Sequence, residues 1–208
     1  MFSIIQAAGW PIWPLLACSV LALALIIERF LALRPAKVMP PQLLEEAMAA
    51  SRHGLPADEV VTQLEASSVF GQVLAGGLRA IQTTPSAPPE AVRTAVQQAG
   101  RLASQRLERY LPALGTIATA APMLGLLGTV VGLIEMFGAQ SPGQGTGSNP
   151  VQLAHGISIA LYNTAFGLIV AIPALVFWRH FRARVDDHLL AMELGAERFV
   201  QHLLSLRR

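Results

Sequence analysis

Four of the polar side chains in or beside the apolar stretches of this 208-residue chain are its candidates for chemistry. Thr129, Asn163 and Thr164 lie deep within apolar sequence, and Glu135 lies near the end of one apolar stretch. A threonine hydroxyl in hydrocarbon either bonds the carbonyl one turn back along its own helix or serves a functional site. The Asn163 amide needs a hydrogen-bond partner, which an interhelical contact or a functional role would supply. Glu135 is either a solvated boundary residue or a group that attracts cations to an entrance.

The motifs do not support enzyme chemistry. The sequence has no HExxH, no GxSxG and no pair of aspartates within an apolar stretch, and Cys18 has no histidine near it. The five histidines and the single cysteine lack the spacing of a metal site, and His155 stands alone near one end of an apolar stretch. We therefore expect no catalytic residue, no metal and no cofactor, and we rank an intramembrane enzyme lowest.

Three long stretches contain no Asp, Glu, Lys or Arg: Met1–Ile27, Tyr110–Ile134 and Met136–Trp178. A helix needs about 20 apolar residues to cross a bilayer core of about 30 Å. All 15 Lys and Arg residues fall in 28–109 and 179–208, and such basic segments stay in the cytoplasm. Charged residues make up only 13% of the chain, against about 25% in a typical soluble domain. The pattern predicts an all-α integral membrane protein with three transmembrane helices and long cytoplasmic helical extensions.

The order of the charges sets the expected topology. Arg29, Arg34 and Lys37 follow the first apolar stretch and nothing basic precedes it, which favours a retained span with its N-terminus outside over a signal peptide. The basic residues are spread singly, so we expect contacts with membrane lipids and no nucleic-acid partner. The predicted segments are a first span at 1–28, a cytoplasmic helical region at 29–109, a second span at 110–137, an outer loop at 138–152, a third span at 153–178 and a cytoplasmic C-terminal helix at 179–208.

Proline and glycine divide the cytoplasmic region into helices. We expect short helices near Ala57–Ser67 and Val69–Ile81, and a long helix that begins at Glu90 after a proline-rich turn. Pro112 is expected to kink this helix at the membrane surface. If the helix nevertheless runs on to Phe137, its roughly 48 residues would form a rod of about 70 Å.

Small residues recur at helical spacing in the second and third spans. Intervals of four, three and four residues place the small side chains of the second span on one face, and the third span also has small residues at helical spacing. Such spacing lets helix backbones approach closely in lipid. We therefore expect these helices to pack against each other and against copies of themselves. The packing residues are Ala121, Gly125, Gly128 and Gly132 in the second span, and Gly156, Ala160 and Gly167 in the third.

The same two spans carry a resemblance. The strings APMLGLLGTVVGLIEMF (121–137) and GISIALYNTAFGLIVAIP (156–173) resemble the MotA/TolQ/ExbB proton channel family. The chain resembles an ExbB- or TolQ-type subunit more than a MotA-type stator, since MotA-type chains have two spans before the cytoplasmic region and this chain has one. In topology the resemblance covers essentially the whole chain.

The resemblance implies a homopentamer in the bacterial inner membrane, with a periplasmic N-terminus and a cytoplasmic C-terminus. The ring would hold the single spans of two copies of an ExbD- or TolR-like partner in a central pore. Protons would cross by way of an aspartate on that partner, and relative movement would pass work to an outer-membrane system. Thr129 and Thr164 match threonines that face the pore in the family, where their hydroxyls would contact the partner's carboxyl group or order water beside it.

One position departs from the family pattern. Many ExbB and TolQ subunits carry a glutamate where this chain has Ile159. Two hypotheses follow: the partner's acid is the only titrating site, or Glu135 and Asn163 substitute for the missing glutamate in part. The choice between proton and sodium stays open. The rival to a conducting subunit is a pentameric scaffold that assembles a partner without ion flow, which pore-facing hydroxyls would disfavour.

Overall fold

The computed structural model describes residues 9–52, 54–138 and 150–206, and all regular structure within these residues is helical. The chain divides into two compact units. The first comprises Met1–Glu28 and Tyr110–His180, and the second comprises Arg29–Arg109 and Phe181–Arg208. Most of the predicted outer loop at 138–152 lies outside the described residues.

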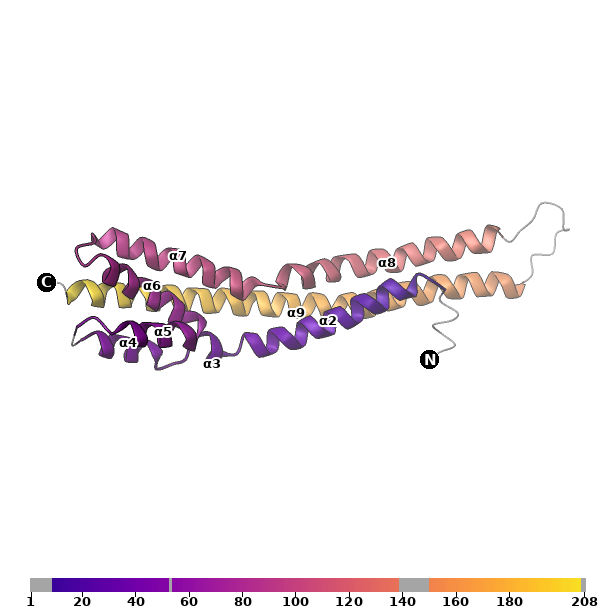
Figure 1. Ribbon diagram of the computed structural model, residues 1–208. Coiled ribbons are helices and arrows are strands. Elements are labelled where there is room, and N and C mark those ends of the chain that lie inside the picture. Colours follow the sequence, from indigo (N-terminus) through magenta and orange to yellow (C-terminus); the bar gives the residue numbers. More distant parts are fainter. Residues whose placement is uncertain (1–8, 53, 139–149, 207–208) are drawn as a thin grey trace. The chain divides into compact units, whose positions relative to one another are not determined.

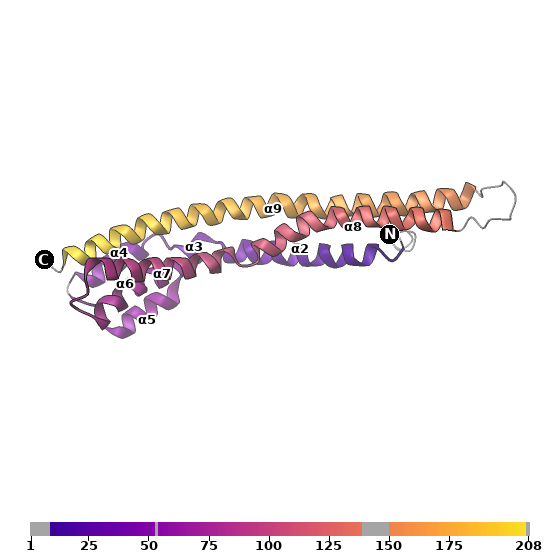
Figure 2. The ribbon, with the colours of Figure 1, turned by 90° about the horizontal axis from the view of Figure 1, so that it is seen from above.

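The first unit contains α2 (Ile12–Ala32) up to Glu28, α8 (Leu111–Gly138), and the N-terminal part of α9 (Pro150–Ser205). Within this unit the three helices run side by side in both views (Figures 1 and 2). Each contains an 18-residue window of mean hydropathy 2.0 or above, so three helices are long and apolar enough to cross a membrane. This finding confirms the all-helical fold predicted from the sequence and identifies three candidate membrane-spanning helices.

The long helix expected from Glu90 onward is interrupted. Helix α7 (Pro89–Glu108) ends before α8 begins at Leu111, and Tyr110 between them has a φ of 70°. The ring of Pro112 would clash with the carbonyl of residue 108 in a continuous helix, which gives the break a local cause. The continuous 48-residue rod considered above is therefore wrong, because Arg109, with a ψ of 134°, and Tyr110, with its positive φ, interrupt the helix.

The second unit is a small helical bundle around α6 (Val69–Thr83), in which Phe70, Leu74 and Leu78 are buried. Ser68 caps this helix, its hydroxyl accepting a hydrogen bond of 3.0 Å from the Gly71 amide. Around it lie α3 (Pro35–Val38), α4 (Leu43–Ser51), α5 (Asp58–Ser67), α7 and the C-terminal part of α9. Helices α5 and α6 lie where the sequence predicted them.

Glycines let the other helices approach this core. A Cβ on Gly195 of α9 would lie 2.7 Å from the ring of Phe70, and one on Gly77 would lie 2.8 Å from Val96 of α7. Both distances are well inside van der Waals contact. The C-terminal part of α9 therefore packs closely on the core of the second unit. One stripe of this predicted amphipathic helix, which includes Phe199, is buried there.

A buried arginine joins α2 to α7 within the second unit. Arg29 is only 4% exposed, and its Nη1 donates a hydrogen bond of 3.0 Å to the carbonyl of Leu107. This carbonyl belongs to the last turn of α7, where helix carbonyls lack partners and attract cations. Arg29, one of the basic residues on which the predicted topology depends, therefore also caps the C-terminal end of α7.

Candidate functional site

Helices α8 and α9 approach each other to backbone contact in the first unit. A Cβ built on Gly125 would lie 3.3 Å from Cα of Gly167, and one on Gly167 would lie 2.7 Å from the carbonyl oxygen of Ala121. Further along, a Cβ on Gly132 would lie 3.0 Å from the carbonyl oxygen of Gly156. These pairs run in opposite chain directions, so the two helices are antiparallel. The seven packing residues chosen from their spacing are all buried: Ala121, Gly125, Gly128, Gly132, Gly156, Ala160 and Gly167.

Asn163 occupies a notch that Gly128 leaves open. Its side chain is fully buried, and its amide nitrogen donates a hydrogen bond of 3.0 Å to the carbonyl of Ile159, one turn back along α9. A Cβ on Gly128 would lie 2.6 Å from Cγ and 2.9 Å from Nδ2 of this amide. The geometry therefore places Asn163 inside the α8–α9 contact of a single chain rather than on an outer face.

The two threonines lie beside this contact and are half-buried. The Thr164 hydroxyl is 3.3 Å from the carbonyl oxygen of Ala160 in its own helix and 3.5 Å from that of Gly125 in α8. The Thr129 hydroxyl donates a hydrogen bond of 2.6 Å to the carbonyl of Leu126. In each case the hydroxyl proton is directed at a backbone carbonyl. The oxygen lone pairs then remain as acceptors for a donor from outside the pair.

Glu135 and Ile159 have opposite environments. Glu135 is exposed in the last turn of α8, which ends at Gly138. Ile159 is 4% exposed, and its Cγ2 would lie 3.3 Å from a Cβ on Gly132. Ile159, the position that departs from the family pattern described above, therefore faces the α8–α9 contact. His155 lies in α9, but its side chain is outside the described residues.

The structure also shows a contact between two residues that the sequence pattern did not connect. Trp178, at the end of the third apolar stretch, packs on Gly115 of α8, where a Cβ would lie 3.0 Å from the indole Nε1. The small residue and the aromatic are both visible in the sequence, but only an antiparallel register brings them together. Among the residues that the structure describes, no three His, Cys, Asp or Glu side chains gather as metal ligands would.

Three apolar helices, two of them joined by a stripe of small residues, define a polytopic α-helical membrane protein. Residues 65–194 match the model of the MotA/TolQ/ExbB proton channel family, so the chain belongs to that family. This span includes all four polar candidates.

Similar proteins carry ExbB and TolQ names. The chain is 33% identical to the putative biopolymer transport protein ExbB-like 3 of Synechocystis sp., over 86% of this chain and 83% of that protein. It is 33% identical to biopolymer transport protein exbB1 of Vibrio cholerae, over 82% and 74% of the two chains. It is also 31% identical to the Tol-Pal system protein TolQ of Pseudomonas aeruginosa, over 83% and 77%. The chain is thus a membrane subunit of a proton-channel family whose members serve biopolymer transport and the Tol-Pal system.

Proposed function

We propose that this chain is the ring-forming subunit of an ion-conducting stator in the bacterial inner membrane. Together with an ExbD- or TolR-like single-span partner, it would couple the proton motive force to mechanical work on an outer-membrane or envelope system. Family membership and the names of its relatives support the proposal. A pentamer around a partner dimer is the arrangement implied by the resemblance.

The proposed topology follows the charges. Helix α2 and the apolar parts of α8 and α9 cross the membrane, the N-terminus and the loop at 138–152 are periplasmic, and 29–109 and 179–208 are cytoplasmic. The absence of Lys and Arg from the loop and their presence in both cytoplasmic segments support this orientation.

The main support for a conducting role is the hydrogen bonding of the Thr164 hydroxyl. Its proton is directed at backbone carbonyls of α9 and α8, and the side chain is still only half-buried. A hydroxyl held this way can accept a hydrogen bond from a protonated carboxyl group or from water. The tight glycine contact beneath it fixes the oxygen's position, so the ring would present a rigid acceptor to the partner's titrating acid.

The scaffold alternative rests on the same hydrogen bonds. Both Thr129 and Thr164 point their hydroxyls at carbonyls one turn back, which is also what a threonine does when it serves helix packing alone. A scaffold would need these residues for assembly and would conduct nothing.

Proton flux in liposomes separates the two functions. The purified chain is reconstituted with and without its partner, and flux is compared between wild type, Thr164→Val and Thr164→Ser. We expect the valine variant to lose about tenfold in flux, the scale of leaving one buried hydrogen-bond donor without an acceptor (about 1–3 kcal/mol), and the serine variant to conduct. Thr116→Val is the matched control, because this threonine bonds the Pro112 carbonyl at 2.9 Å and is exposed.

An intact complex in which Thr164→Val conducts as well as Thr116→Val would contradict the acceptor role. No flux from wild type with its partner bound would favour the scaffold. Repeating the assay with sodium in place of the proton gradient identifies the ion. Unchanged flux in Glu135→Gln would exclude Glu135 from the pathway.

A further inference from the structure

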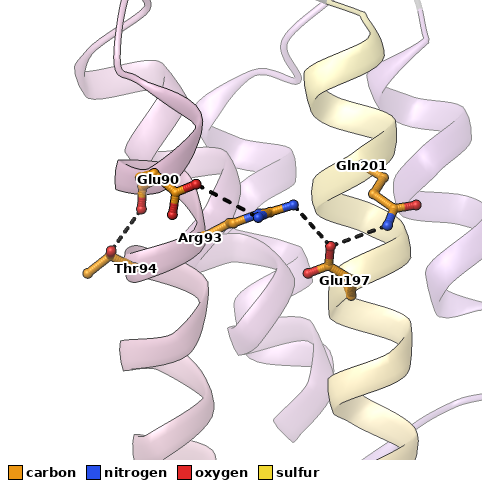
Figure 3. Close-up of polar contacts among 5 residues, drawn as sticks. All are labelled: Glu90, Arg93, Thr94, Glu197 and Gln201. Carbon is orange, nitrogen blue, oxygen red and sulfur yellow. Dashed lines mark hydrogen bonds and ion pairs between the residues drawn. The ribbon is translucent and has the colours of Figure 1, made fainter.

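A groove of about 790 Å³ lies between α7 and the C-terminal part of α9 in the second unit. Two ion pairs join these antiparallel helices: Arg93 Nη2 lies 3.3 Å from Oε1 of Glu197, and Arg182 Nη1 lies 3.3 Å from Oε1 of Glu108. Figure 3 shows the first pair, with Arg93 reaching across from α7 to α9. Between the two pairs the helices are open, because a Cβ on Gly100 of α7 would meet nothing within 4 Å.

The groove has an apolar floor and two walls of opposite charge. Arg101 projects from the α7 wall and Glu193 from the α9 wall. Within the described part of the chain neither side chain has an ion-pair partner. Leu190 and Leu194, which also line the groove, are 60% and 59% exposed. The floor consists of Val73, Val96, Met192, Ala196 and Val200.

A second exposed stripe runs along the opposite side of α7. Gln98, Leu102 and Gln105 follow one another at intervals of four and three residues, Arg109 comes directly after the last residue of α7, and none of the four lines the groove. All four are exposed, and Leu102 at the centre is 63% exposed. The stripe is therefore an apolar knob between two amides, with a cation at one end.

We propose that the groove of one copy of this chain receives the Leu102 stripe of a second copy. Leu102 would cover Leu190 and Leu194 of its neighbour, and the amides on either side of it would meet the wall that carries Glu193. The amides of the stripe can donate to Glu193 and accept from Arg101, so they suit a groove with walls of both charges. The inference rests on the proposed ring and names the cytoplasmic surfaces that build it.

The arrangement of the two surfaces determines the kind of assembly. The stripe and the groove lie on different sides of α7, so each copy offers both surfaces and they face different neighbours. Such a head-to-tail contact generates a closed ring or an open chain, whereas a two-fold contact would stop at a dimer. The ring in the membrane and the contact in the cytoplasmic region are then consistent with each other.

Disulfide trapping between two tagged copies tests the contact. Cys18 is the only cysteine, so a Cys18→Ala background lets each introduced thiol be assigned. One copy carries Leu102→Cys and the other Leu194→Cys, so that a crosslinked pair can form only between copies. Thr62→Cys replaces Leu102→Cys in the control, since Thr62 is exposed on α5 and belongs to neither surface. We expect at least about tenfold more crosslinked pair than in the control, because neighbouring thiols have a high effective concentration.

Two substitutions test the same contact without crosslinking. Leu102→Glu places a carboxylate against Glu193 and should lower the ring population about tenfold in native mass measurements, and adding Glu193→Arg should restore it. Gly100→Leu fills the groove from within one chain, where the structure leaves room for the side chain. It should prevent ring formation while the helical content of each chain stays unchanged.

Crosslinking no stronger than in the Thr62 control, in a protein whose native mass still shows several copies, would overturn this contact and leave the proposed function standing. Rings that survive both Leu102→Glu and Gly100→Leu would overturn it as well. A native mass of one chain for the wild type, with and without the partner, would overturn the contact and the proposed ring together.

Discussion

Replacing Gly128 with alanine should separate α8 from α9. The added Cβ would lie 2.6 Å from Cγ of Asn163 and 2.9 Å from its Nδ2, and closer still to its Cβ. Ordinary carbon contacts begin near 3.5 Å, so the helices must move apart by about 1 Å or Asn163 must leave its notch. Neither change is local, because Gly125 and Gly132 contact the α9 backbone on either side.

The two opposing contributions set the size of the effect. Overpacking of a close contact costs about 1–3 kcal/mol, and the helix propensity of alanine over glycine returns up to about 1 kcal/mol. We expect a net loss of about 1–2 kcal/mol in the free energy of unfolding, a factor of about 5–30 in the unfolding equilibrium. Packing has to supply most of this stability, since lipid provides no hydrophobic drive between helices.

Unfolding of the detergent-purified protein by increasing SDS, followed by helical circular dichroism, measures this difference. Gly138→Ala is the matched control, because it lies on the same helix and a Cβ there meets nothing within 4 Å. The exchange Gly128→Ala with Asn163→Gly should recover part of the loss by moving the notch to the other helix. If Gly128→Ala and Gly138→Ala unfold at the same SDS concentration, α8 and α9 do not approach each other as closely as the structure shows.

Two further predictions concern the second unit. Arg29→Met should destabilise the protein by about 1.5–3 kcal/mol, because the carbonyl of Leu107 loses a charged donor; the exposed Arg34→Met should change stability by less than about 0.5 kcal/mol. Equal SDS midpoints for these two variants would refute the capping role. Arg93→Met should lower stability by about 0.2–1 kcal/mol, since its pair with Glu197 is 41% and 48% exposed. The loss should shrink at high salt, and a salt-independent loss would mean that Arg93 acts by packing instead.

The face of small residues on α8 could be recognised in the sequence because its spacing is a local signal. Ala121, Gly125, Gly128 and Gly132 share one face of any regular helix, whatever surrounds it. The structure sets that face against α9 at backbone distance. What the spacing could not supply is the register, and the register decides that Asn163 meets Gly128. The sequence left two roles open for the Asn163 amide, an interhelical contact or a functional role, and spacing alone could not show which residue it meets on the neighbouring helix.

The break between α7 and α8 was harder to predict. Pro112 alone permits either a kink or a stop, and the sequence contains no glycine at the junction to favour a stop. Tyr110 takes a positive φ, which a bulky residue rarely does, so the surrounding structure must hold it there. The end of α7 is itself held from a distance, because the buried Arg29 caps the Leu107 carbonyl from 78 residues away in sequence. Long-range contacts of this kind leave no periodic signal.

The four polar candidates divide into different roles once their surroundings are known. Asn163 is enclosed within one chain, and the two threonine hydroxyls direct their protons at carbonyls. Glu135 stands at the end of α8, and Ile159 places a hydrocarbon where the family often has a carboxylate. The stretches Tyr110–Ile134 and Met136–Trp178 contain no Asp, Glu, Lys or Arg. In the proposed stator the titrating carboxyl group would therefore come from the partner chain, and the hydroxyl oxygens of Thr129 and Thr164 would be the acceptors that meet it.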